Sequence, residues 1–163
     1  MQSVSVDDYI LTDNMLQNCA GIVSYTGTPN ISSVTEYLKG DTLVSNIRPY
    51  LKKIWLADKN GGCSKDVLLF RNKTPKTLNN EYLKVILSTQ EFFDYMMVGK
   101  TGIKMPRGDK KIIHSFEVPI PSIKIQAKIV EAMNSIDNEY NHNPMTLDKE
   151  LEAKRAVLSK YLQ

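Results

Sequence analysis

The sequence predicts an α+β protein, in which a head with a small mixed β-sheet and short helices is followed by a C-terminal helical, coiled-coil-like arm. Short β-branched and aromatic runs lie between residues 42 and 118, and apolar residues recur at helical spacing beyond residue 122. Between them stands the rigid segment Val118-Pro119-Ile120-Pro121. We therefore place the head at residues 1–121 and the helical region at 122–163. With 163 residues, of which 42% are hydrophobic, the chain can form one globular domain plus an appendage.

Four runs in the head are typical of β-strands because they are rich in β-branched or aromatic residues and bounded by turn-forming residues. They span residues 42–47, 53–57, 66–70 and 112–118. Between the second and third, Lys59-Asn60-Gly61-Gly62 predicts a hairpin turn, because Asn and Gly tolerate positive φ.

Two helices are expected between the third and fourth strands. Asn79 and Asn80 offer an N-cap for a helix that begins near Glu81. Ser88-Thr89-Gln90-Glu91 has the form of a capping box that starts a second helix, which Gly99 ends. Apolar residues at helical spacing predict a core face made of Leu83, Ile86, Leu87, Phe92, Phe93, Met96 and Met97.

The helical region carries two apolar stripes. The first is formed by Ile125, Ile129, Met133 and Ile136, and Asn141-His142-Asn143-Pro144 interrupts it. The last helix, roughly 28 Å long at 1.5 Å per residue, either folds back on the core or docks on another helix. Its length, and Lys154 and Tyr161 at seam positions, favour docking. The predicted dimerisation or docking residues are Leu147, Leu151, Leu158 and Leu162.

No catalytic or metal-binding constellation emerges from the motifs. Gly99-Lys100-Thr101 ends like a phosphate-binding P-loop, but Asp94 stands where that loop needs a glycine. The cysteines and histidines lack the spacing of a zinc site; they are Cys19, Cys63, His114 and His142. Without a signal peptide or an apolar span, the chain is expected to be cytoplasmic and not associated with a membrane.

Two loops are locally basic, although the formal net charge is only +3 and the pI about 8.7. One carries Lys39, Arg48, Lys52 and Lys53 against Asp41 alone, and the other carries Lys100, Lys104, Arg107, Lys110 and Lys111 against Asp109 alone. In the second loop, glycines let backbone amides approach a phosphate, and Arg107 beside Pro106 suits the edge of a guanine. On these residues alone, nucleic-acid binding and a solvated surface are evenly matched interpretations.

Five segments, taken in order, resemble the specificity subunit of type I restriction-modification enzymes. They are Tyr9 through Asp13-Asn14-Met15-Leu16, Gly40-Asp41 to Lys53, Gly62-Cys63-Ser64-Lys65-Asp66-Val67, Lys104-Met105-Pro106-Arg107-Gly108, and Pro119-Ile120-Pro121 to Gln126-Ala127-Lys128-Ile129-Val130. The resemblance covers nearly the whole chain. It implies a target recognition domain up to about Pro121, followed by a helical spacer and docking arm.

The resemblance also implies a division of labour. The family's specificity subunit does no chemistry and has no cofactor. It positions modification subunits, which methylate adenine with S-adenosylmethionine, and restriction subunits, which use ATP and Mg to translocate and cut. A typical specificity subunit has two recognition domains and two helical regions, so this chain resembles a half-subunit.

We therefore expect a non-catalytic subunit that binds double-stranded DNA at a specific sequence and pairs with a second copy or with another specificity chain. The predicted DNA-binding residues, of which Asn46, Lys104 and Arg107 are assigned to base edges, are Lys39, Asn46, Arg48, Lys52, Lys53, Lys100, Thr101, Lys104, Arg107 and Lys110. One alternative is an assembly or antagonist protein that docks on modification subunits without strong DNA binding. Another is an enzyme whose site the motifs do not reveal.

Overall fold

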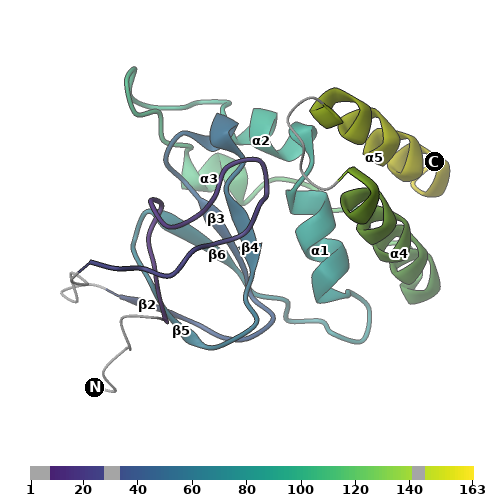
Figure 1. Cartoon of the computed structure of the whole chain (residues 1–163), viewed down its shortest axis with the longest axis horizontal. Coiled ribbons are helices and arrows are strands. Elements are labelled where there is room, and N and C mark those ends of the chain that lie inside the picture. Colours follow the sequence, from purple (N-terminus) through teal and green to yellow (C-terminus); the bar gives the residue numbers. More distant parts are fainter. Residues whose placement is uncertain (1–7, 28–33, 141–145) are drawn as a thin grey trace.

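Two three-stranded β-sheets lie on one side of the molecule and the two longest helices on the other (Figure 1). The structure, a computed structural model, describes residues 8–27, 34–140 and 146–163. In the first sheet the central strand is parallel to one neighbour and antiparallel to the other, in the order β1 (Tyr9–Ile10), β5 (Gly61–Cys63) and β2 (Thr35–Tyr37). The second sheet is antiparallel, in the order β4 (Ile54–Leu56), β3 (Thr42–Ser45) and β6 (Val67–Phe70). These elements confirm the α+β class.

β3 is the central strand of the second sheet and is buried along its whole length. Leu43 pairs with Trp55 on one side and Leu69 on the other, so both edges of β3 are hydrogen-bonded. A strand covered on both faces needs continuous apolar or small polar residues, which its sequence provides. The first three predicted strands are thus confirmed in shortened form as β3, β4 and β6.

The hairpin turn predicted at residues 59–62 is wrong. β4 and β6 pair with β3 and not with each other, and the chain between them crosses to the first sheet as β5. Gly61 and Gly62 lie in that strand, where a Cβ on Gly61 would collide with the backbone of Asp8 and the ring of Tyr37. The glycines therefore mark a close approach of strands and not a turn.

The strand predicted at residues 112–118 is also wrong. Its first residues belong to a short helix, α3 (Lys110–Ile113), and no strand follows as far as residue 118. The side chain of Asp109 caps this helix by accepting a hydrogen bond of 2.8 Å from the N–H of Lys111. Capping and the burial of Ile113 in the core override the β-propensity of this stretch.

The two central helices, α1 (Asn80–Leu87) and α2 (Gln90–Met96), agree with the sequence prediction. Asn79 caps α1 as expected, whereas Thr89 caps α2 and Ser88 ends α1, one residue away from the predicted capping box. Both caps accept a hydrogen bond from a backbone N–H of the first turn. The predicted core face is buried in Leu83, Ile86, Leu87, Phe92, Phe93 and Met96, and Met97 is partly buried.

The C-terminal helices α4 (Ile123–Tyr140) and α5 (Leu147–Tyr161) pack on each other and on the head (Figure 1). Residues of α4 are buried in the same hydrophobic cluster as those of α1 and α2, and the end of α5 packs against that cluster. Of the two alternatives for the last helix, the structure shows the fold-back onto the core. The predicted break at residues 141–144 lies outside the described residues. Among the described residues, no helix combines the length and apolarity that a membrane span requires.

A buried glutamine fixes α4 to the head. Gln126 has no exposed surface, and its Oε1 accepts a hydrogen bond of 2.8 Å from the N–H of Asn79. Its Nε2 donates to the carbonyl oxygens of Thr77 and Pro121, each at 2.8 Å. Beside this contact, Tyr82 donates from its hydroxyl to the Pro119 carbonyl at 2.7 Å, and burial raises the pKa of that hydroxyl to about 12. The Pro-Ile-Pro joint is therefore held at both ends.

Candidate nucleic-acid interface

A narrow loop, residues 101–107, projects from the molecule at the upper left of Figure 1. Thr101 and Arg107 close it by two backbone hydrogen bonds, of 3.0 Å and 2.9 Å, so that the loop forms a short hairpin. Gly102 turns the chain at a φ of +85°, where a side chain would be strained. We call residues 101–107 the reading hairpin.

The segment that follows β3 anchors the base of the reading hairpin. The N–H of Arg48 donates to the carbonyl oxygen of Pro106 at 2.8 Å. The side-chain Nδ2 of Asn46 donates to the carbonyl oxygen of Gly108 at 3.1 Å. The buried hydrogen bond between Asn46 and Gly108 therefore joins residues that lie 62 positions apart in the sequence.

These contacts bring Arg48 of the first basic loop beside the second basic loop. Arg107 also forms an ion pair of 3.4 Å with Asp66, and the N–H of Asn46 donates to the Asp66 carbonyl at 2.8 Å. Lys65 precedes that aspartate, and Lys65 and Lys110 line one groove together with His114. We define the basic face by its exposed cations, which are Arg48, Lys65, Lys100, Lys104, Arg107 and Lys110.

Four of the predicted DNA-binding residues do not present their side chains on this face. Asn46 is only 6% exposed and its amide supports the reading hairpin, so it cannot reach a base edge in this conformation. Lys53 is partly buried and donates to the carbonyl oxygen of Thr12 at 2.6 Å. Lys52 lines a cavity beneath α5. The fourth residue, Lys39, is described next.

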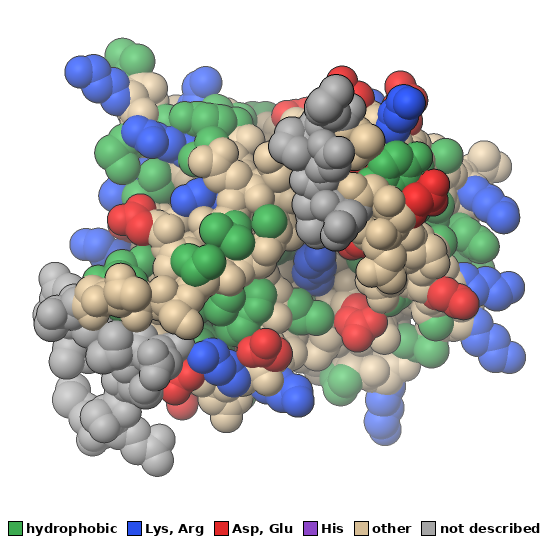
Figure 2. Space-filling view, viewed as in Figure 1, with side chains coloured by type: hydrophobic (Ala, Val, Ile, Leu, Met, Phe, Trp, Pro, Cys, Tyr) green, Lys and Arg blue, Asp and Glu red, His purple; other side chains and the backbone are tan. Residues whose placement is uncertain are grey.

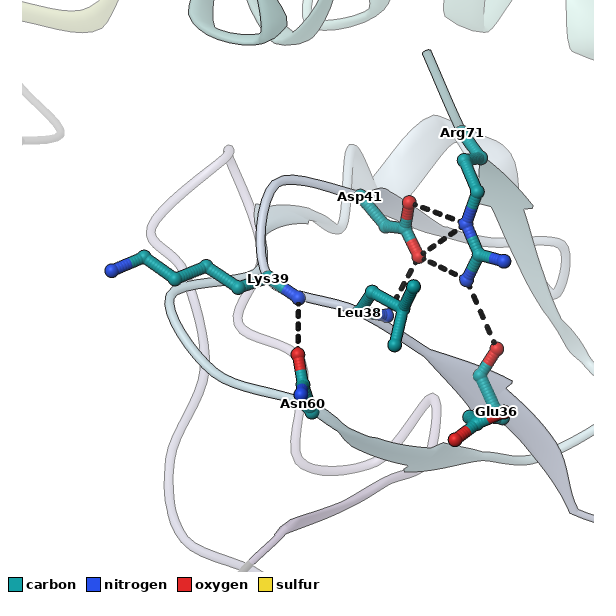
Figure 3. Close-up of polar contacts among 6 residues, drawn as sticks. All are labelled: Glu36, Leu38, Lys39, Asp41, Asn60 and Arg71. Atoms are coloured by element: carbon teal, nitrogen blue, oxygen red, sulfur yellow. Dashed lines mark hydrogen bonds and ion pairs between the residues drawn. The ribbon is translucent and has the colours of Figure 1, made fainter. Parts of the chain in front are cut away.

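Lys39 lies before β3 and Arg48 after it, so the two cations stand at opposite ends of that strand. Figure 3 shows the turn that holds Lys39, whose N–H donates to Asn60 at 2.7 Å while its side chain points away from the other residues drawn. The carboxylate of Asp41, only 3% exposed, accepts the Leu38 N–H of this turn at 2.7 Å and pairs with Arg71, at 2.9 Å to Nε and 2.6 Å to Nη2. These hydrogen bonds raise the pKa of the Arg71 guanidinium. The Gly40-Asp41 motif is therefore structural.

Three residues of the interface do not stand out in the sequence. Lys65 gains its position only through the crossing of the chain between the two sheets. Ile103 is 100% exposed and Met105 is 51% exposed at the end of the reading hairpin, although apolar residues are normally assigned to a core. Figure 2 shows hydrophobic and basic side chains together on this projecting segment. Among the described residues, no group of three or more His, Cys, Asp or Glu side chains could hold a metal ion.

The leucines of α5 face their own chain. Leu147, Leu151 and Leu158 line the cavity beneath α5, and Leu162 packs against the core. The outer face of the helix is polar, with exposed Asp148, Lys149, Glu152, Arg155 and Lys160. All four leucines are partly buried on the side of the helix that faces α4 and the core, and their role in pairing with a second chain stays a prediction.

An ion-pair network closes this cavity. The Nζ of Lys154 lies 2.5 Å from Asp137 of α4 and 2.6 Å from Glu150 of α5, which is only 4% exposed. Burial alone would lower the pKa of Lys154, but the hydrogen bonds to the two carboxylates outweigh it and raise that pKa. Burial raises the pKa of the neighbouring Cys19 thiol, and nearby lysines partly offset this effect. The network is structural, since it joins α4 to α5.

Comparison with known proteins relates this geometry to one family. A model of the family described as "Type I restriction modification DNA specificity domain" matches residues 7–153. The type I restriction enzyme EcoDI specificity subunit of Escherichia coli is 27% identical over 105 residues, which cover 64% of this chain and 23% of that protein. A second type I specificity subunit of Escherichia coli is 28% identical over 103 residues, covering 55% of this chain and 25% of that protein.

Two solved structures share the fold. The HsdS subunit from Thermoanaerobacter tengcongensis superposes with a TM-score of 0.66 at 19% identity, covering 82% of this chain and 36% of that one. A chain from a structure titled for complex assembly and conformational transition of the type I R-M system gives a TM-score of 0.64 at 18% identity, covering 82% of this chain and 37% of that one. This chain thus spans about a quarter of the curated relatives and somewhat more than a third of the solved chains.

Proposed function

We propose that this chain, which belongs to the type I restriction-modification DNA specificity family, reads a specific DNA sequence with its basic face and directs partner subunits to it. The observation that carries the proposal is that the hydrogen bonds of Asn46 and Arg48 hold Arg48 beside the second basic loop. Clustered cations around a projecting hairpin suit a phosphate backbone flanking a groove. Membership of the family supports DNA as the ligand, and the hydrogen bonds between the two loops support the basic face as the surface that binds it.

The cations on the face divide into two roles. Arg48, Lys65, Lys100 and Lys110 flank the reading hairpin and would neutralise phosphates, which position the protein without reading sequence. Lys104, Thr101 and Arg107 lie in the hairpin itself and would address base edges. Arg107 is half-exposed and only loosely paired with Asp66 at 3.4 Å, so its guanidinium is oriented but still able to bind a guanine.

The chain acts in this proposal as a non-catalytic subunit in the cytoplasm. Modification subunits would methylate adenine with S-adenosylmethionine, and restriction subunits would supply ATP- and Mg-dependent cleavage. The family relationship supports these partners. The helical region 122–163 would be the docking arm, and the reading hairpin projects on the side of the molecule away from α4 and α5 (Figure 1).

Pairing with a second copy, or with another specificity chain, is part of the same proposal. Because the leucines of α5 are packed internally, such pairing would use the polar outer face of α5 or exchange α5 between two chains. Sedimentation velocity over a wide concentration range tests it. A monomer at every concentration, alone and with modification subunits, would remove self-pairing and leave a different specificity chain as the partner.

The test of function begins with methylome sequencing of the source organism with and without this gene, which identifies the target as a lost adenine-methylation motif. Binding of the chain with its modification subunits to that target is then measured as a function of salt. The double variant Arg48→Gln, Lys100→Gln should flatten the salt slope by roughly 2, since each phosphate contact contributes about 0.9. Arg107→Ala should cost about 1–3 kcal/mol and relax discrimination at one position.

Lys39→Gln is the matched control, because it removes one positive charge at the opposite end of β3 and should leave binding unchanged. Parental affinity in both the double variant and Arg107→Ala would show that the basic face is not the interface. Weak, salt-insensitive binding by the parent would instead favour the assembly or antagonist protein.

A further inference from the structure

The tip of the reading hairpin is apolar, although cations surround it. Ile103 is 100% exposed, Met105 is 51% exposed, and Val98, just before the hairpin, is 54% exposed. Single exposed apolar residues are common on protein surfaces. Here, however, the largest exposure falls at the end of a projecting segment between Lys100 and Arg107. Ile103 is the most exposed of the large hydrophobic side chains that the structure describes.

We propose that the reading hairpin enters the major groove of the target duplex and that Ile103 packs against the C5-methyl group of a thymine. The inference rests on the proposed function and adds to it a specificity-determining residue that reads by apolar contact. Ile103 would distinguish thymine from cytosine at one position, because the thymine methyl is the apolar group that base edges display in the major groove.

The form of the hairpin suits the major groove. The two arms of the hairpin are joined as a ribbon by the hydrogen bonds between Thr101 and Arg107. The major groove, about 12 Å wide, admits a two-stranded ribbon, and it is the groove in which the thymine methyl is displayed. The hydrogen-bonding side chains Thr101, Lys104 and Arg107 would then lie along the same groove as Ile103.

The base of the hairpin is fixed well enough to place one methyl contact. Pro106 is buried, and its carbonyl accepts the Arg48 N–H at 2.8 Å. Gly108 is buried against its neighbours, where an added Cβ would lie 2.8 Å from both Ile113 and the Met96 carbonyl. A loop that enters a groove loses less conformational entropy on binding when its base is already rigid in the free protein. The exposed tip is therefore carried by a base that is already ordered.

The experiment removes the thymine methyl group from the DNA and, separately, the Ile103 side chain from the protein. Full-length chain assembled with its modification subunits is titrated with the methylome-defined duplex, and each thymine is replaced singly by deoxyuridine, which lacks only the methyl. One replacement should weaken parental binding by about 4-fold, the effect of one buried methyl-sized group. Ile103→Ala should bind the thymine and uracil duplexes equally and should bind an unrelated duplex as the parent does.

Ile120→Ala is the matched control, because Ile120 is also exposed, at 55%, but lies in the proline joint. It should retain the parental thymine dependence. Because the side chain of Ile103 is fully exposed, the Ile103→Ala variant should have the same urea midpoint as the parental protein. A loss of binding by this variant would therefore not reflect unfolding.

Two results would overturn the inference. In one, Ile103→Ala keeps the parental dependence on every thymine methyl. In the other, it leaves DNA binding intact and weakens assembly with the modification subunits, so that the tip is a protein contact. If the parental protein bound the target and an unrelated duplex equally, the proposed function itself would be overturned. This outcome is distinguishable from the other two because it is measured on the parental protein alone.

Discussion

Replacing Gln126 by alanine should loosen the joint between the head and the helical arm. The side chain is fully buried and makes three hydrogen bonds of 2.8 Å, to the N–H of Asn79 and the carbonyls of Thr77 and Pro121. At about 1 kcal/mol net per bond, the loss is about 3 kcal/mol, and unpaired backbone groups left behind keep it from being smaller. We expect the free energy of unfolding to fall by that amount.

Urea denaturation followed by circular dichroism measures this change. With a slope of about 2 kcal/mol per molar urea, a loss of 3 kcal/mol lowers the midpoint by about 1.5 M. Lys128→Ala is the control, because this residue is exposed on the same helix and should change stability by less than about 0.5 kcal/mol. If Gln126→Ala unfolds at the parental midpoint, the three hydrogen bonds do not hold the arm in solution.

Gln126→Glu tests the same contact through pH. One glutamate oxygen can still accept the Asn79 N–H, but the other faces two carbonyl oxygens and needs a proton to donate to either. Burial and these acceptors would raise the carboxyl pKa in the folded state above the unfolded value of about 4.3. Stability of this variant should therefore be greatest below pH 4 relative to the parent and fall as the pH rises through the folded-state pKa. A pH-independent difference between variant and parent would contradict this geometry.

Three further predictions concern other parts of the fold. Asn46→Ala removes the buried bond to Gly108 and should cost about 1–2 kcal/mol of stability in urea and also weaken target binding, whereas a base-reading role would change only binding. Lys154→Met leaves Glu150 buried without its partner and should cost at least about 2 kcal/mol, which adding Glu150→Gln should largely restore in a double-mutant cycle. Burial raises the pKa of the Cys63 thiol to about 11, so this cysteine should resist alkylation at pH 8 until the protein is unfolded, which mass spectrometry of the labelled peptide would show.

The parts of the fold that depend on local chemistry could be predicted from sequence. Asn79 and Thr89 cap their helices through backbone groups only three residues away, and the core faces of α1 and α2 follow helical spacing. The helix at Lys110–Ile113 was missed because the β-propensity of its isoleucines outweighed the Asp109 cap in the interpretation. Strands of two or three residues, such as β1 and β5, carry too little pattern to be recognised.

The candidate site shows where sequence reasoning ends. Both basic loops were recognised, but their union depends on contacts between Asn46 and Gly108, which the sequence separates by 62 positions. Polar residues are usually expected at the surface and apolar residues in the core, and two residues of this site do the opposite. Asn46 is buried because its amide pairs with a backbone carbonyl, and Ile103 is exposed because nothing in the chain covers the hairpin tip. Polarity alone therefore favoured Asn46 for a base edge, although its amide is engaged inside the head, and did not single out Ile103.

The contacts between the basic face and the helical arm form a continuous path through the head. Beyond Arg48, the 3₁₀ turn η2 (Pro49–Leu51) leads to Lys52, whose carbonyl accepts the N–H of Cys19 at 2.8 Å. Cys19 and Lys52 both line the cavity closed by Lys154, which joins α4 to α5. Backbone hydrogen bonds and a shared cavity therefore connect the base of the reading hairpin with the arm. On the proposed function, a partner docked on the arm would be placed at a fixed distance from the bases being read, which is what a non-catalytic subunit must achieve to direct methylation to one adenine.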